Sequence, residues 1–199
     1  MLLKHGNSYI RRSTRNQAPL LAIKFPCYFA NFRVKLVFCN IYQGSPATMI
    51  ETFEGQCQCN EVKYRIIGIP ITLFVCHCTE CQRQSSSAFG MALWVRDANI
   101  QISSGTLKEW IRTMPSGRSM TCSFCPTCGT RLFHKLLGQS EFMSIKPGTL
   151  NNTSRLEPVG HIWLNSKQRW VQVTANALQY MGNPENFEEL ISAWGETHA

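Results

Sequence analysis

Seven of the ten cysteines in this 199-residue chain fall into three short clusters between residues 57 and 128. The clusters are Cys57-Gln58-Cys59, Cys76-His77-Cys78-Thr79-Glu80-Cys81 and Cys125-Pro126-Thr127-Cys128-Gly129. Four thiolates complete a tetrahedral zinc site, whereas three leave a coordination position open for water or a substrate. The count of seven therefore predicts one closed structural zinc and one zinc that is available for chemistry.

The first and third clusters are predicted to share the structural zinc. Cys57 and Cys59 are two residues apart, so on a strand both side chains point to the same face. Cys125 and Cys128 enclose a proline and precede Gly129, a composition that favours a tight turn. Sulfurs on one tetrahedral zinc lie roughly 3.8 Å apart, which such pairs can reach. A metal that joins distant parts of the chain has a structural role.

The central cluster, with Cys76, Cys78 and Cys81, is predicted to hold the second zinc with one position open. Two alternatives remain. A fourth ligand from His77 or Cys122 would close the site, or the cluster would be a redox or metal-free group of thiols. His77 alternates with its cysteine neighbours, so on an extended backbone it faces away from them.

The first 48 residues differ from the rest of the chain. They contain seven basic and no acidic residues, whereas the remainder contains 13 basic and 12 acidic ones. We expect residues 1–48 to be disordered, as a targeting segment, a basic tail or sequence upstream of a natural start at Met49. Residues 49–199 are predicted to form one domain with no nucleic-acid footprint of its own. Cys27 and Cys39 are expected to be plain thiols.

Metal ligation is favoured over disulfide bonding for these cysteines. The apolar run at residues 20–23 is too short for a signal peptide, and no apolar stretch approaches the roughly 18 residues that cross a bilayer. The sequence therefore predicts a cytoplasmic protein without a membrane partner, or a mitochondrial one if residues 1–48 are a transit peptide. Closely spaced cysteines in a reducing compartment are typical of metal sites.

The pattern of secondary structure predicts a mainly β fold. Many short segments with alternating or β-branched residues are separated by Gly, Pro and Asn. The predicted strands are residues 61–66, 72–75, 88–95, 100–102, 107–114, 131–135, 141–145, 161–164 and 170–173. A helix is predicted over residues 184–194, with Asn183 as N-cap and Gly195 as the stop.

The order of the three cysteine clusters resembles the glutathione-dependent formaldehyde-activating enzyme (GFA) family, which also includes centromere protein V. The resemblance covers about residues 52–172. Its supporting segments are Gly55-Gln56-Cys57-Gln58-Cys59, Phe89-Gly90, Gly148-Thr149-Leu150, Pro158, His161-Ile162-Trp163, Ser166-Lys167 and Trp170. The resemblance implies a fold of zinc-stapled antiparallel sheets that is similar to the Mss4-like fold. Asn151-Asn152 departs from the family, where an acidic pair is frequent.

The resemblance also implies an activity and two sets of ligands. It implies a carbon–sulfur lyase-type enzyme that condenses glutathione, as co-substrate, with formaldehyde or a related small aldehyde to S-hydroxymethylglutathione. The implied structural zinc ligands are Cys57, Cys59, Cys125 and Cys128. The implied catalytic zinc ligands are Cys76, Cys78 and Cys81.

Other polar residues are weaker candidates. A glutathione carboxylate is expected to bind one of three arginines, namely Arg83, Arg96 and Arg131. For the histidines His77, His134 and His161, a structural or surface role is expected rather than acid–base chemistry.

Two other functions compete with the enzyme. One is a non-catalytic zinc-binding β module for protein or nucleic-acid interaction. The other is a methionine sulfoxide reductase of the B type, which is disfavoured because no cysteine follows Cys128.

Overall fold

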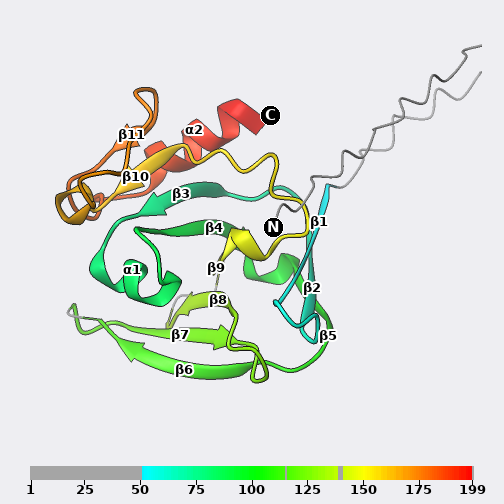
Figure 1. Cartoon of the computed structure of the whole chain (residues 1–199). Helices are drawn as coiled ribbons and strands as arrows, with labels where there is room; N and C mark the ends of the chain where they lie inside the picture. The colour runs from blue at the N-terminus through cyan, green and yellow to red at the C-terminus, as the bar shows by residue number, and fades with distance from the viewer. Residues whose placement is uncertain (1–50, 115, 139–140, 199) are drawn as a thin grey trace, which may run out of the picture. The chain divides into compact units, whose positions relative to one another are not determined.

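The computed structural model describes residues 51–114, 116–138 and 141–198, which form two β-sheets and two α-helices (Figure 1). The predictions for residues 1–48, including those for Cys27 and Cys39, lie outside the described residues. None of the helices in the described part of the chain has the length and apolar character that crossing a bilayer requires. The predicted mainly β fold with a C-terminal helix is confirmed.

The smaller sheet is antiparallel and has the strand order β1–β2–β5. Its strands are β1 (Thr52–Gln56), β2 (Lys63–Ile67) and β5 (Ile100–Ser104). In β2, Tyr64 and Ile66 are buried while Lys63 and Arg65 are exposed, which is the alternation of a strand with one buried face. The ring of Tyr64 packs edge-on against Phe133 of the larger sheet, with 5.0 Å between centroids. The two sheets therefore share one hydrophobic core.

The larger sheet has the strand order β11–β10–β3–β4–β9–β8–β7–β6. Its strands are β3 (Thr72–Cys76), β4 (Gly90–Arg96), β6 (Lys108–Thr113), β7 (Ser119–Phe124), β8 (Arg131–Leu136), β9 (Phe142–Ile145), β10 (Gly160–Ile162) and β11 (Leu178–Gln179). Most neighbours are antiparallel, as predicted, but β10 runs parallel to both β3 and β11. Every residue of β3 is buried, which suits a strand that is paired on both sides.

Two helices flank the larger sheet. Helix α2 (Glu188–His198) lies alongside β3 and β10 (Figure 1). The carbonyl of its fully buried Leu190 accepts a hydrogen bond of 2.8 Å from the hydroxyl of Thr72. A Cβ atom at Gly160 would lie only 2.4 Å from the Leu190 side chain, so this glycine permits the close approach of helix and strand. Short helix α1 (Thr79–Ser85) connects β3 to β4.

The predicted elements differ from the structure in several details, and the strands β1, β7 and β11 were not predicted. The C-terminal helix begins at Glu188, because the backbone N–H of Glu188 donates a hydrogen bond to the side chain of Asn186. The helix then continues through Gly195. Residues 170–173 form no strand, because the Lys167 ammonium binds the carbonyls of Gln168 and Val171 and closes a loop. Helix α1 was not predicted, since a seven-residue helix without a buried residue has no apolar periodicity.

Candidate metal centres

The first centre gathers four cysteines from two distant turns. The sulfurs of Cys57, Cys59, Cys125 and Cys128 all lie within 4.8 Å of one another. The Cys57 and Cys59 sulfurs are 3.5 Å apart, and those of Cys59 and Cys125 are 3.7 Å apart. Sulfurs on one tetrahedral zinc are separated by roughly 3.8 Å. The four thiols therefore fit a closed zinc site, as the spacing of the two clusters predicts.

Two tight turns present these sulfurs. In the first, the backbone N–H of Cys57 donates to the Val62 carbonyl, and Asn60 takes a positive φ of 64° that lets the chain reverse. The N–H of Val62 also donates to the Cys57 sulfur at 3.2 Å. In the second turn, Gly129 has a φ of 73°, a conformation that glycine adopts without steric cost. Both turns thus satisfy their backbone groups while the sulfurs converge.

The second centre gathers three cysteines from one short stretch of chain. The sulfurs of Cys76, Cys78 and Cys81 lie within 4.8 Å of one another. Cys76 ends β3, Cys78 is the N-cap of α1, and Cys81 lies in the first turn of that helix. The Cys78 sulfur accepts a hydrogen bond of 3.4 Å from the Cys81 backbone N–H. The change from strand to helix folds the three thiols around one point.

Neither predicted alternative ligand joins this group. Within the described part of the chain, no His, Cys, Asp or Glu side chain joins the three cysteines as a fourth potential ligand. His77 is fully buried, and its Nε2 lies 2.9 Å from Nδ1 of His161. Cys122 is a buried residue of β7 that faces Trp110 and His134 on the neighbouring strands. Among the described residues, the second centre thus offers three thiols that could bind a metal and no fourth side chain.

The segment after β10 holds the three-cysteine loop in place. The backbone N–H of His77 donates to the Ile162 carbonyl, and the two imidazoles of His77 and His161 stack 5.2 Å apart. The Gln82 amide of α1 donates to the carbonyls of both His77 and Ser166. These bonds fix the loop from outside the thiol cluster. His77 and His161 therefore have structural contacts, in line with the expectation from sequence.

One thiol in each cluster has a strongly lowered pKa. Hydrogen bonds with the Cys76 and Cys81 thiols lower the pKa of Cys78 to about 2, while the pKa of Cys76 is raised by the same interaction. Hydrogen bonds with the Thr130 hydroxyl and backbone N–H lower the pKa of Cys128 to about 5. One thiol in each cluster is therefore held as the thiolate, the metal-binding form, while the pKa values of its neighbours Cys59, Cys76 and Cys81 are raised.

A cavity of about 310 Å³ adjoins the three-cysteine cluster. Gly90 lines it, and a Cβ atom built on Gly90 would lie 3.2 Å from the Cβ of Cys81. Arg131 and Lys146 line it as well, and the charge of Lys146 interacts with the thiols of Cys81 and Cys76. Arg131 was one of three arginines considered from the sequence, whereas Lys146 was missed. The only signal for Lys146 is its place directly before Pro147-Gly148-Thr149-Leu150.

The model of one protein family matches this chain, namely that of the glutathione-dependent formaldehyde-activating enzymes, GFA. The match spans residues 52–166, more than half of the chain, and includes all seven clustered cysteines. The chain belongs to this family. Membership implies an enzyme of glutathione and formaldehyde chemistry, and it agrees with the two thiol clusters.

Comparisons with solved structures and with curated proteins add no functional information. A crystal structure of a protein from Rhodobacter sphaeroides is similar at 18% sequence identity with a TM-score of 0.42. The alignment covers 51% of this chain and 91% of that one. A search of curated proteins found no match.

Proposed function

We propose that this GFA-family protein is a zinc-dependent carbon–sulfur lyase that condenses glutathione with formaldehyde or a related small aldehyde. The product would be S-hydroxymethylglutathione. The observation that carries the proposal is the cluster of Cys76, Cys78 and Cys81, which has three thiols, no fourth ligand among the described residues and a cavity beside it. The family's description supplies the two substrates.

The two clusters are assigned different roles. Cys57, Cys59, Cys125 and Cys128 would hold a structural zinc, because four thiols satisfy the tetrahedral preference of the ion. Cys76, Cys78 and Cys81 would hold a zinc with one free position. A zinc held there would supply a Lewis acid, which lowers the pKa of a coordinated thiol so that its proton passes to solvent and its sulfur is fixed in place.

The reaction itself is an addition without redox chemistry. A bond forms between the glutathione sulfur and the carbonyl carbon, the carbonyl π bond breaks, and the thiol proton ends on the oxygen. The protein's own residues hold the thiol cluster rigid through His77, Gln82 and Ser166. They also surround the approaching glutathione with the walls of the adjoining cavity, which brings the reactants together in one orientation.

The proposal includes a setting for the reaction. We propose that residues 49–199 form the working domain and that it acts in the cytoplasm, or in mitochondria if residues 1–48 direct import. Reduced glutathione in such compartments keeps thiol clusters available for metal.

The test combines zinc content with turnover. Purified protein should contain two zinc ions per chain, and NMR exchange spectroscopy should report faster interconversion of glutathione and S-hydroxymethylglutathione than in buffer. Protein treated identically but carrying Cys78→Ser is the control. A single tightly bound zinc and no acceleration would reject the enzyme and favour a zinc-binding interaction module.

A further inference from the structure

The cavity beside Cys81 has two cationic residues in its wall, and both come from the larger sheet. Arg131 begins β8, and Lys146 directly follows β9. These strands are antiparallel neighbours, and the Lys146 backbone N–H donates to the Leu132 carbonyl at 2.9 Å. Sheet pairing therefore brings together two cations that are 15 positions apart in the sequence.

Neither cation is neutralised by a carboxylate within reach. Among the described residues, the ion pairs within 4.0 Å involve other cations: Arg65, Arg83, Arg112, Lys135 and Arg155. Burial lowers the pKa of Lys146, and the adjacent thiols of Cys81 and Cys76 act against this shift. Two cations without an acidic partner at the wall of a cavity are a ready-made environment for an anion.

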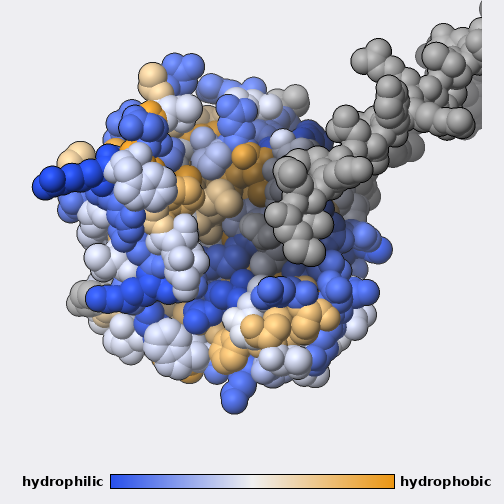
Figure 2. Space-filling model, viewed as in Figure 1, coloured by the Kyte–Doolittle hydropathy of each residue, from blue (hydrophilic) through white to orange (hydrophobic). Residues whose placement is uncertain are grey.

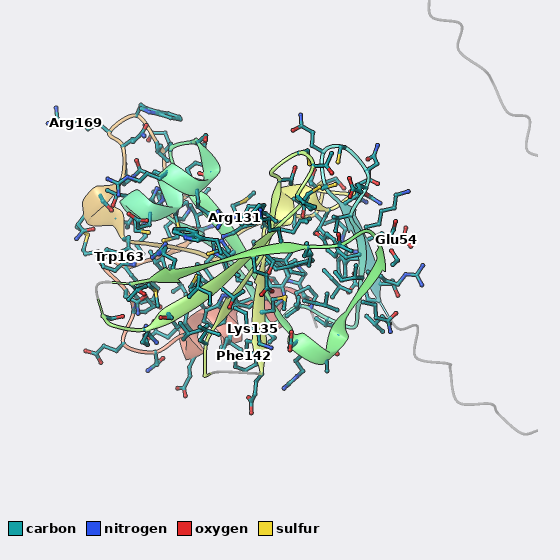
Figure 3. All side chains as sticks on the ribbon, turned by 90° about the horizontal axis from the view of Figure 1, so that it is seen from below. Glu54, Arg131, Lys135, Phe142, Trp163 and Arg169 are labelled. Carbon is teal, nitrogen blue, oxygen red and sulfur yellow. The ribbon has the colours of Figure 1, made fainter. Side chains whose placement is uncertain are left out.

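Arg131 is held in position by its neighbours. Its Nη1 donates to Nε2 of His134 at 3.2 Å. The centre of its guanidinium lies 5.8 Å from the ring centroids of both Trp110 and Phe124. Figure 3 places Arg131 toward the middle of the molecule, whereas Arg169 lies at its edge. A guanidinium has five N–H donors, so the bond to His134 leaves others for a ligand.

We infer that Arg131 and Lys146 form a carboxylate-binding subsite that holds one end of the thiol substrate while its sulfur reaches the three-cysteine centre. This inference rests on the proposed function, because it deepens the choice of glutathione as the thiol. A volume of about 310 Å³ is at the small end of ligand sites, which suits one arm of a tripeptide better than the whole molecule. Figure 2 shows the face that carries α1, where the surface is hollowed near its middle.

Of the three arginines that the sequence offered as carboxylate ligands, the structure favours Arg131. Arg83 is an exposed residue of α1 that pairs with Glu80, and Arg96 ends β4 at an exposed position. Arg131 lines the cavity instead, with its guanidinium pre-organised. Arginine binds carboxylates through two parallel N–H donors, which gives geometric selectivity for a carboxylate over a neutral group.

The test measures binding without chemistry. S-methylglutathione keeps both carboxylates of glutathione but has no thiol, so it cannot react or ligate a metal as a thiolate. Calorimetric titration of the zinc-loaded full chain should detect its binding. Arg131→Gln and Lys146→Gln should each weaken that binding about tenfold or more, the loss expected for one charge-assisted hydrogen bond. Arg83→Gln, which removes an exposed charge two residues from Cys81, should change it less than twofold.

A ligand control uses the unaltered protein. The dimethyl ester of S-methylglutathione should bind wild-type protein about tenfold more weakly or worse, and this result does not depend on how the variants fold. Equal binding of acid and ester, an equal effect of Arg83→Gln, or no binding of S-methylglutathione would overturn the subsite. Binding that depends on the carboxylates, without accelerated S-hydroxymethylglutathione formation, would reject the proposed reaction and leave the subsite standing.

Discussion

The four-cysteine and three-cysteine centres differ in how far apart their thiols lie in the sequence. The four-cysteine centre joins residues 66 positions apart, since Cys59 meets Cys125, and so ties the small sheet to the large one. The three-cysteine centre draws all its thiols from the six positions between Cys76 and Cys81. A metal in the first therefore stabilises tertiary structure, whereas a metal in the second constrains one loop that hydrogen bonds already hold. Under the proposed assignment, the closed centre is therefore the one that links distant segments of the chain, and the open centre is the local one.

The largest expected effect comes from Cys125→Ser. Zinc contributes roughly 10–16 kcal/mol in small zinc domains, so losing one of four ligands removes a large part of a total stability of about 5–15 kcal/mol. The variant should be largely unfolded by circular dichroism and should retain less than two zinc ions. Cys122→Ala is the matched control, because Cys122 is equally buried and joins neither cluster. A folded Cys125→Ser protein with two zinc ions would remove the distinction between the centres.

Cys78→Ser should abolish activity but leave the fold intact, in contrast to Cys125→Ser. The fold should persist, since β3 and α1 keep their backbone hydrogen bonds, but acceleration of S-hydroxymethylglutathione formation should fall to the background rate. Zinc content should drop toward one ion per chain. Thermal unfolding together with the NMR exchange assay checks both statements. If Cys78→Ser destabilises the protein as much as Cys125→Ser, the assignment of the reactive centre is wrong.

A chelator should remove the two proposed zinc ions at different rates. A site with three thiols should release its zinc roughly tenfold faster or more than one with four thiols, because one coordination position is open to the chelator. A colorimetric zinc assay after addition of a chelator should therefore report two phases of one equivalent each. Circular dichroism should change only in the second phase. A single phase that coincides with unfolding would contradict the comparison.

The smallest expected effect is a pH dependence of stability that arises from His134, whose Nε2 lies 3.2 Å from Nη1 of Arg131. Burial, together with the charges of Lys146, Arg131 and Arg112, lowers the pKa of His134 from 6.5 to about 2. Below pH 6.5 the unfolded chain binds a proton at His134 that the folded chain does not, so stability falls as the pH drops. The contribution is at most about 1.4 kcal/mol per pH unit and continues toward pH 2.

The measurement compares wild-type protein with His134→Gln by urea unfolding at pH 7 and pH 5. Glutamine does not titrate, so the variant should lose less stability between the two conditions. Loss of zinc in acid affects both proteins alike and cancels in the comparison. An identical loss in the two proteins would mean that His134 is not held neutral by its surroundings.

The sequence predicts local arrangements well where a short-range rule applies. The alternation in residues 61–66 predicts a half-buried strand, and the structure has β2 at Lys63–Ile67 with Tyr64 and Ile66 buried. Prediction failed where a contact between near neighbours in the chain, rather than apolar periodicity, sets the extent of a helix. Gly195 is a good helix stop in isolation, yet α2 continues to His198, whose ring stacks on Trp194 at 3.6 Å. Helix α1 was missed because its first turn is defined by the Cys78 cap rather than by apolar periodicity.

The sequence alone determined the three cysteine clusters, since two- and three-residue spacings fix which sulfurs share a turn, but their convergence into groups of four and three required the tertiary contact of Cys59 with Cys125. Only the tertiary structure decided that Cys122 and His77 stay outside the clusters, because strand pairing directs Cys122 toward Trp110 and His134, and His161 binds His77. The tertiary structure also brings Arg131 and Lys146 together, because β8 and β9 are paired. Spacing along the chain determines geometry within a turn, but residues on different strands meet only through the register of the sheet.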